Sequence, residues 1–259
     1  MDELAVAKLA ALEAGRLLLD FQGKSHLPFK IKESHYSLVT AADLASERKI
    51  VEIIKAHFPG HGILSEERSR KIAGDWVWVV DPLDGTSAFR RGFVNYSVSI
   101  ALLYQNRPVI GVIYQPVLNQ LFIAQRDKGA FLNNEKISTS QISEINHAVV
   151  TLSHSDLRFF DNHKNFKKLF YDANLVRLLN SCALELAYLA AAKCDILIQV
   201  NQPVWDIAAG SLLVEEAGGQ ILNFKGDRII FKTSCDFQEH IIALNAKFAA
   251  EQILDYIHE

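Results

Sequence analysis

Residues 76 to 86 constrain the fold of this chain most, because a run of bulky apolar residues leads directly into two carboxylates. The segment reads Trp-Val-Trp-Val-Val-Asp-Pro-Leu-Asp-Gly-Thr. Its first five residues are aromatic or β-branched without polar alternation, which predicts a strand that is covered on both faces. Pro82 fixes its own φ angle, and Gly85 permits backbone conformations that side chains disfavour. We therefore expect Asp81 and Asp84 to lie on a stiff turn.

Two explanations of this turn remain open from its own residues. Rigidly held carboxylates beside free backbone N–H groups suit a divalent cation and a phosphate together. Thr86 would then supply a hydroxyl at the start of a helix. Alternatively, the segment is an Asx-type turn in which Asp84 caps that helix.

Two further segments place acids next to apolar elements. Residues 63 to 67 read Ile-Leu-Ser-Glu-Glu, and residues 204 to 210 read Val-Trp-Asp-Ile-Ala-Ala-Gly. With these motifs the chain resembles the inositol monophosphatase family of Mg-dependent phosphatases. The family's signatures are an acidic pair after a strand, D-P-[IL]-D-G-T, and W-D-x-A-x-G. The resemblance extends from residues 39 to 43 (Val-Thr-Ala-Ala-Asp) to residues 215 to 219 (Glu-Glu-Ala-Gly-Gly).

Composition agrees with a globular enzyme. The 259 residues are 49% hydrophobic and 22% charged, enough for one large unit or two packed halves. The net charge of −3, without long basic runs, argues against a nucleic-acid partner. Three cysteines without C-x-x-C spacing argue against disulfides and zinc, and favour the cytoplasm. The acidic amino terminus and the absence of long apolar runs argue against a signal peptide or a membrane partner.

The periodicity of apolar residues predicts a mixed α/β fold in two halves. Residues 1 to 143 should form an α+β half that contains an antiparallel sheet and most metal ligands, and residues 144 to 259 an α/β half that contains Asp206 and the wall that selects the substrate. The resemblance implies a layered α/β/α/β/α sandwich. The predicted helices are residues 4 to 21, ending near Gly23, and 40 to 58; the predicted strands are 98 to 104, 109 to 115, 120 to 124, 148 to 152, 175 to 178, 196 to 200 and 241 to 244.

The resemblance also implies a site that holds two or three Mg²⁺ ions. The first ion would be held by Glu66, Asp81 and the carbonyl oxygen of Leu83. The second would be held by Asp81, Asp84 and Asp206. Catalysis would involve Glu66 and the hydroxyl of Thr86, hydrogen-bonded to Asp43, with water attacking phosphorus directly. The implied substrate-binding residues are Asp84, Gly85, Thr86, Cys182, Ala183, Gln199 and Asp206.

Several of these residues have purely structural explanations. Thr40 and Asp43 also form a good capping box, and Asp206 suits the first turn of any helix. Glu67 should point away from Glu66, because neighbours on a strand face opposite sides. Trp205 is expected to pack in the core. Gln199 either contacts the leaving group or ends a strand in solvent, and the sequence does not separate these possibilities.

The resemblance implies hydrolysis of a small phosphorylated substrate, lithium sensitivity and a homodimer. Residues 37 to 43 are similar to the bisphosphate nucleotidase branch, whereas residues 183 to 188 look like bacterial inositol monophosphatases. Gln199 stands where a Glu usually accepts inositol hydroxyls, and Asn180 stands where a Gly usually opens the pocket floor. Arg90 and Arg91 form either a solvated tip or a site for a second anion. Inositol 1-phosphate is the expected substrate; the alternative is a 3'(2'),5'-bisphosphate nucleotidase, and fructose-1,6-bisphosphatase or histidinol phosphatase fits less well.

Two other classes of protein compete with this interpretation. In haloacid dehalogenase-type phosphatases, the first Asp of a strand-Asp-x-Asp motif is a covalent nucleophile. Here two residues, Pro82 and Leu83, separate the acids, which disfavours that chemistry. The second class is a non-catalytic member that uses the fold as a binding scaffold. The presence of every ligand-type residue argues against a purely non-catalytic role.

Overall fold

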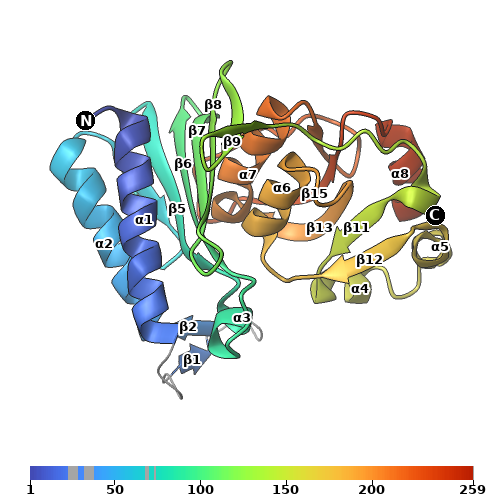
Figure 1. Ribbon diagram of the computed structural model, residues 1–259, viewed down its shortest axis with the longest axis horizontal. Helices are drawn as coiled ribbons and strands as arrows, with labels where there is room; N and C mark the ends of the chain where they lie inside the picture. The colour runs from blue at the N-terminus through green and yellow to red at the C-terminus, as the bar shows by residue number, and fades with distance from the viewer. Residues whose placement is uncertain (23–28, 32–37, 68–69, 73, 259) are drawn as a thin grey trace.

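The computed structural model describes residues 1–22, 29–31, 38–67, 70–72 and 74–258, arranged as helices and sheets in layers (Figure 1). The predicted end of the first helix near Gly23 and the first residue of the 37-to-43 motif lie outside the described residues. The described helices are α1 (Glu3–Gln22), α2 (Ala41–His57), α3 (Thr86–Arg90), α4 (His154–Phe159), α5 (Lys164–Asp172), α6 (Cys182–Ala190), α7 (Val204–Glu216), α8 (Ala250–Ile257) and the short 3-10 helix Ile145–His147.

The first large sheet has the strand order β10-β9-β8-β7-β6-β5-β3-β4. Its neighbours are antiparallel except for the parallel pair β3 and β5. β1 (Phe29–Ile31) and β2 (Leu38–Thr40) pair antiparallel in a separate two-stranded sheet. The strands of the large sheet are β3 (Gly62–Ser65), β4 (Arg70–Lys71), β5 (Trp76–Asp84), β6 (Ser97–Tyr104), β7 (Arg107–Gln115), β8 (Gln120–Gln125), β9 (Gly129–Leu132) and β10 (Glu135–Ile137).

Alternation along β5 explains how both faces of this sheet are covered. Trp78 and Val80 join the apolar cluster with α1 and α2, whereas Val77 and Val79 join the cluster with α6 and α7. The predicted strand with two buried faces is therefore confirmed for these residues. Trp76, the first residue of β5, is instead 37% exposed. Gly111 provides a close approach to α7, because a Cβ there would lie 2.6 Å from the carbonyl oxygen of Ala209.

The second sheet is mixed and has the order β12-β11-β13-β15-β14. β12, β11 and β13 are parallel, and β15 runs antiparallel to both of its neighbours. Helices α6 and α7 lie between the two sheets, and α4, α5 and α8 cover the outer face (Figure 1). Its strands are β11 (Val149–Leu152), β12 (Leu175–Leu178), β13 (Ile196–Pro203), β14 (Gln220–Asn223) and β15 (Gln238–Leu244).

These layers confirm the expected α/β/α/β/α sandwich. The seven predicted strands are all present. In the two large sheets, the short strands β4, β9, β10 and β14 were not predicted; β14, for example, has four residues with little apolar pattern. The two large sheets occupy residues 62 to 137 and 149 to 244. The proposed division of the chain after residue 143 remains a prediction. Within the described part of the chain, no helix is long and apolar enough to cross a membrane.

Candidate active site

The end of β5 places its two acids on the same side of the strand. Asp81 and Asp84 are three residues apart, and an odd spacing on a regular strand would point them to opposite faces. The structure avoids this with a bulge, because Asp81 pairs with Ser99 and Asp84 pairs with Ser97. The expected turn between the acids is therefore wrong: the strand continues through Asp84. Pro82 suits the bulge because a missing N–H is tolerated there.

Four acids are close enough to interact electrostatically at this point. Burial raises the pKa of Asp81 well above its ordinary value, and Asp81 is only 2% exposed. Three neighbouring acids raise this pKa further: Glu66, Asp206 and Asp84. Glu66 is held beside Asp81 because its N–H donates to the carbonyl oxygen of Val80 at 3.2 Å. Glu66 and Glu67 both follow the end of β3 at Ser65, so the expectation that they face opposite sides of a strand is wrong; the named contribution to the pKa of Asp81 comes from Glu66.

This set of carboxylates has the chemistry of a site for hard divalent cations. A bound cation would offset the repulsion between these acids and lower the pKa of Asp81. Among the described residues, no three His, Cys, Asp or Glu side chains are already arranged around a common ion position. The grouping of acids therefore fits a cation by charge and donor type, and the individual ligand assignments remain proposals.

Gly85 makes the connection from β5 to α3 possible. Its φ angle is 88°, and a Cβ there would lie 2.5 Å from the carbonyl oxygen of Asn95. Both observations require glycine. Gly85 is the N-cap of α3, without a side-chain cap. The alternative in which Asp84 caps this helix is therefore wrong.

Asp43 serves two structural purposes at once. One oxygen, Oδ2, accepts the N–H of Thr40 at 2.8 Å and its hydroxyl at 2.5 Å, which completes the capping box of α2. The other oxygen, Oδ1, lies 3.1 Å from the hydroxyl of Thr86. The two explanations of Asp43 are therefore compatible. Thr86 can alternatively donate its single proton to the carbonyl oxygen of Leu83, at 3.0 Å.

Asp84, at the end of β5 in the first sheet, is in direct contact with the start of α6. Its Oδ2 accepts the hydroxyl of Ser181 at 2.6 Å and the N–H of Leu184 at 3.3 Å. Burial raises the pKa of Asp84 to about 6, although hydrogen bonds from Ser181, Leu184 and Ala183 act in the opposite direction. Ser181 is a site residue that the sequence analysis missed. A serine directly before a helix was the available signal, but it resembles an ordinary cap.

The predicted substrate-binding residues of the second half lie near this contact but are mostly enclosed. Cys182 is 5% exposed, and Ala183 is fully buried. Gln199 is 2% exposed and donates from Nε2 to Oε2 of Glu185 at 2.7 Å. The alternative that Gln199 ends its strand in solvent is therefore wrong. Asn180 has a φ angle of 58°, a conformation that also suits glycine.

Asp206 and Trp205 take the expected positions on α7. Asp206 lies in the first turn of the helix. Trp205 is 9% exposed and belongs to the central apolar cluster, and its carbonyl oxygen accepts the hydroxyl of Ser99 at 3.2 Å. Because Ser99 pairs with Asp81, this hydrogen bond ties the start of α7 to the acidic end of β5. Arg91 is exposed just beyond α3.

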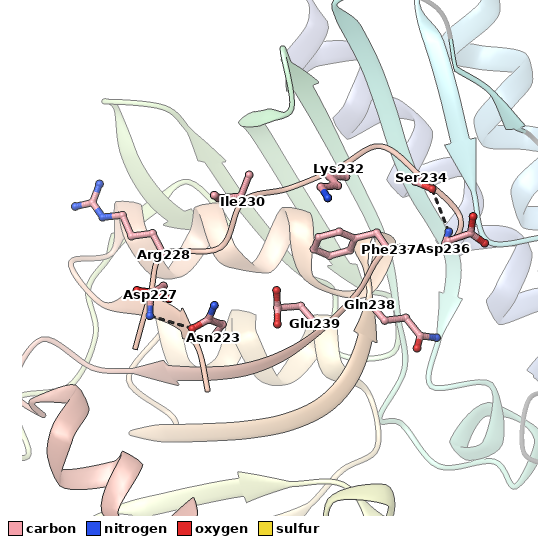
Figure 2. A pocket seen from close by; sticks show the side chains of 10 residues that line it. All are labelled: Asn223, Asp227, Arg228, Ile230, Lys232, Ser234, Asp236, Phe237, Gln238 and Glu239. Atoms are coloured by element: carbon pink, nitrogen blue, oxygen red, sulfur yellow. Dashed lines mark hydrogen bonds between the residues drawn. The ribbon is translucent and has the colours of Figure 1, made fainter. Parts of the chain in front are cut away.

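A cavity of about 780 Å³ lies elsewhere, along the connection from β14 to β15. Figure 2 shows that its side chains come from residues 223 to 239, including Arg228, Lys232 and Glu239. It shares no lining residue with the acidic cluster. Cations and acids are mixed along its wall, which gives no clear ligand chemistry. We therefore place the candidate active site at the acids and not at this cavity.

Comparisons with known proteins show which family the chain belongs to. A model of the inositol monophosphatase family matches residues 2–259. The chain is 38% identical to "Nus factor SuhB" of Xylella fastidiosa over 220 residues, covering 84% of this chain and 80% of that protein. It is 33% identical to "Fructose-1,6-bisphosphatase/inositol-1-monophosphatase" of Thermotoga maritima over 227 residues, covering 87% and 86%.

The solved structures show the same relationship. A Thermotoga maritima IMPase superposes with a TM-score of 0.89 at 29% identity, covering 99% of this chain and 97% of that one. The family match spans nearly the whole chain, including every acid of the candidate site. The chain belongs to the inositol monophosphatase family, a family of phosphatases.

Proposed function

We propose that this protein is a Mg²⁺-dependent phosphomonoesterase that acts on a small polyol or sugar phosphate, with inositol 1-phosphate as the preferred candidate. The observation that carries this proposal is the convergence of acids on Asp81 at the end of a buried strand. Such a cluster is costly without a cation, and a phosphate monoester is the kind of anion that bound cations attract. The family match supports the reaction class.

The donor set suggests how two or three Mg²⁺ ions would be held. Glu66, Asp81 and the carbonyl oxygen of Leu83 suit one ion, and Asp81, Asp84 and Asp206 suit another. Leu83 donates its N–H to Asp81 at 2.9 Å, which keeps that carbonyl and that carboxylate in a fixed relationship. When bound, Mg²⁺ would neutralise the phosphate and lower the pKa of the attacking water.

Thr86 and Asp43 are proposed to orient that water. The Thr86 hydroxyl has two acceptors, Asp43 Oδ1 and the Leu83 carbonyl, for its single proton. Its oxygen lone pairs therefore remain able to accept a hydrogen bond from water. Asp43 is fixed through its other oxygen by the cap of α2. Water would attack phosphorus directly, and no side chain is needed as a covalent nucleophile.

The backbone N–H groups of Gly85 and Thr86 are proposed to contact the phosphate. Cys182 and Ala183 lie at the start of α6. The N–H of Ala183 interacts with the carboxylate of Asp84. Contact of either residue with substrate remains a prediction.

Lithium inhibition through the Asp81, Asp84 and Asp206 site follows from the resemblance. Retention of full activity over a wide range of lithium concentrations would remove that assignment.

Gln199 bears on the choice between inositol 1-phosphate and a 3',5'-nucleoside bisphosphate. Replacing Gln199 with Glu should favour the inositol ester, because a carboxylate binds hydroxyls strongly and repels a second phosphate. The structure adds a cost, since the new carboxylate would lie against the buried Glu185. The double variant Glu185→Gln/Gln199→Glu keeps one charge and is the better probe. An unchanged ratio of kcat/KM for the two substrates would remove Gln199 from substrate selection.

The test of the proposed function is phosphate release from a panel of substrates with added Mg²⁺. Inositol 1-phosphate, adenosine 3',5'-bisphosphate, fructose 1,6-bisphosphate and histidinol phosphate should be compared by initial rates. We expect the inositol ester to give the highest kcat/KM, and Asp81→Asn to abolish release. Absence of Mg²⁺-dependent release from every ester would overturn the proposal. We also expect the protein to be a homodimer and to act in the cytoplasm. Analytical ultracentrifugation would measure the oligomeric state.

A binding role beside catalysis is the second candidate, because the Xylella fastidiosa relative is named as a factor and not by a substrate. The Asp81→Asn variant separates the two roles. A cellular function that survives in this variant would belong to binding, and one that is lost would belong to catalysis.

A further inference from the structure

Glu185 is a buried carboxylate that none of the proposed chemical steps uses. It lies in the first turn of α6 and is 0% exposed. Ionisable side chains are rarely buried to this degree unless hydrogen bonds satisfy them. Its position between the two sheets therefore calls for an explanation in terms of its partners.

The two oxygens of Glu185 hold two different parts of the chain. Oε1 accepts the N–H groups of Leu179 and Asn180, at 3.0 and 3.1 Å. Oε2 accepts Nε2 of Gln199 at 2.7 Å. All three contacts require only an acceptor. The carboxylate thus joins the loop before α6 to the middle of β13.

The loop that Glu185 holds contains one residue in the left-handed region. Asn180 has a φ angle of 58°, a conformation that Asn adopts more readily than most other residues. Its side chain also accepts the N–H of His154 at 3.2 Å. The helix N–H of Glu185 returns to the carbonyl oxygen of Ser181 at 2.9 Å. These contacts fix the residue that follows Asn180, which is Ser181.

Ser181 connects this loop to the acids of β5. Its hydroxyl donates to Oδ2 of Asp84 at 2.6 Å, and the Leu184 N–H reaches the same oxygen at 3.3 Å. A small displacement of the loop would therefore release one side of Asp84. Misplacement of a catalytic group by about 1 Å can lower a rate by about a hundredfold.

We propose that Glu185 is a positioning residue of the phosphatase site, which fixes the loop 179–181 so that Ser181 orients Asp84. This inference rests on the proposed function, since Asp84 matters here as a ligand of that site. Glu185 touches neither substrate nor reacting atoms. Its effect requires acceptor oxygens facing the loop, and it does not require the negative charge.

Two substitutions of matched length separate the acceptor from the charge. Glu185→Met removes both acceptors, and we expect kcat to fall by about 10- to 100-fold. Glu185→Gln keeps one carbonyl oxygen for Leu179 and Asn180, while the amide of Gln199 can rotate to accept from the new NH₂ group. We expect kcat of Glu185→Gln to stay within about threefold of the wild type.

Asp195, which directly precedes β13, supplies a control. It is 4% exposed and accepts hydrogen bonds from Ser140, from the N–H of Val149 at 2.7 Å and from Asn245 at 3.1 Å. Asp195→Ala should lower the melting temperature and leave kcat unchanged well below that temperature. If Glu185→Met behaves in the same way, the role of Glu185 is structural only and the proposal is overturned.

Ser181→Ala tests the connection and also covers the case in which Glu185→Met does not fold. Because both residues act on Asp84 through one chain of contacts, the double variant should lose little more activity than either single variant. The proposal would be contradicted if the losses of kcat in the two single variants multiply in the double variant, or if Ser181→Ala keeps the wild-type kcat.

Calorimetric titration with Mg²⁺ provides a readout without substrate. Glu185→Met should bind Mg²⁺ about tenfold more weakly than the wild type, and Glu185→Gln should bind it as the wild type does. If the wild type binds Mg²⁺ but hydrolyses no ester, the proposed function fails while this titration still tests Glu185.

Discussion

At the amino end of β13, Asp195 is surrounded by hydrogen-bond donors, whereas at the carboxyl end of β5, Asp81 is surrounded by other acids. Asp195 accepts from Ser140, Val149 and Asn245. Asp81 accepts from the Leu83 N–H and experiences the charges of three acids. Both carboxylates are almost fully buried. The difference teaches that burial alone does not mark a functional acid; repulsion from neighbouring acids that the protein's own hydrogen-bond donors do not offset does.

The largest expected effect is that a substitution at Asp81 lowers kcat but not stability, whereas one at Asp195 lowers stability but not kcat. Asp81→Asn should lower kcat by about a thousandfold or more, with unchanged or higher stability in the absence of metal, because it removes a repelled charge. Asp195→Asn should keep kcat and lose about 1 to 3 kcal/mol of stability, because both carboxyl oxygens accept hydrogen bonds and the new NH₂ group cannot. Initial rates and chemical denaturation measure both. Near-normal activity of Asp81→Asn at saturating Mg²⁺ would break the comparison.

Metal binding should stabilise only through the acidic end of β5. At a Mg²⁺ concentration of about 100 times Kd, a single site adds about 2.7 kcal/mol to the free energy of unfolding. We expect such a gain in the wild type and in Asp195→Asn, but a much smaller one in Asp81→Asn. Thermal unfolding with Mg²⁺ or with a chelator is the measurement. Equal stabilisation of all three proteins would place the cation elsewhere.

Gly85 extends the comparison to the backbone. Gly85→Ala should destabilise the protein by about 1 to 3 kcal/mol, because its φ angle is 88° and the added Cβ meets the carbonyl oxygen of Asn95. Gly60 is the matched control, since a Cβ there has no neighbour within 4 Å. Gly60→Ala should change stability by less than about 0.5 kcal/mol. Equal effects in urea denaturation would show that the connection to α3 is not constrained.

The smallest expected effect is a dependence of metal-free stability on pH. The pKa of Asp84 is raised in the folded protein from 3.8 to about 6. A raised acid favours folding while it is protonated, so its contribution is complete below about pH 4 and is lost as the pH rises through 6. Between pH 5 and pH 8 we expect a loss of about 1 kcal/mol in chelator. Asp84→Asn should flatten this part of the profile, and an unchanged slope would contradict the assignment.

Local patterns in the sequence were sufficient for the long helices α1 and α2 and for the longer strands of both large sheets. Apolar runs predicted the central strands of both sheets, and Thr40 correctly marked the start of α2. The strand β14 was missed because four residues with few apolar side chains carry no period. Trp76 was expected to be buried with its neighbours, yet as the first residue of β5 it is partly exposed.

The candidate site was predictable in its residue types but not in its geometry. The motifs identified Asp81, Asp84 and Asp206 as a group. The bulge that aligns the first two depends on pairing with β6, which no local pattern reveals. Ser181 and Glu185 were missed for a similar reason, because their importance comes from partners that are distant in the chain.

The contact between Asp84 and α6 also has a consequence for folding kinetics. Asp84 and Ser181 are 97 positions apart in the chain, and Ser99 and Trp205 are 106 apart. Contacts of such long range form only after large loops have closed, so we expect the acids to meet late, when α6 and α7 dock on the first sheet. A cation bound by those acids would then stabilise the native state more than the transition state. It should slow unfolding and leave the rate of folding nearly unchanged.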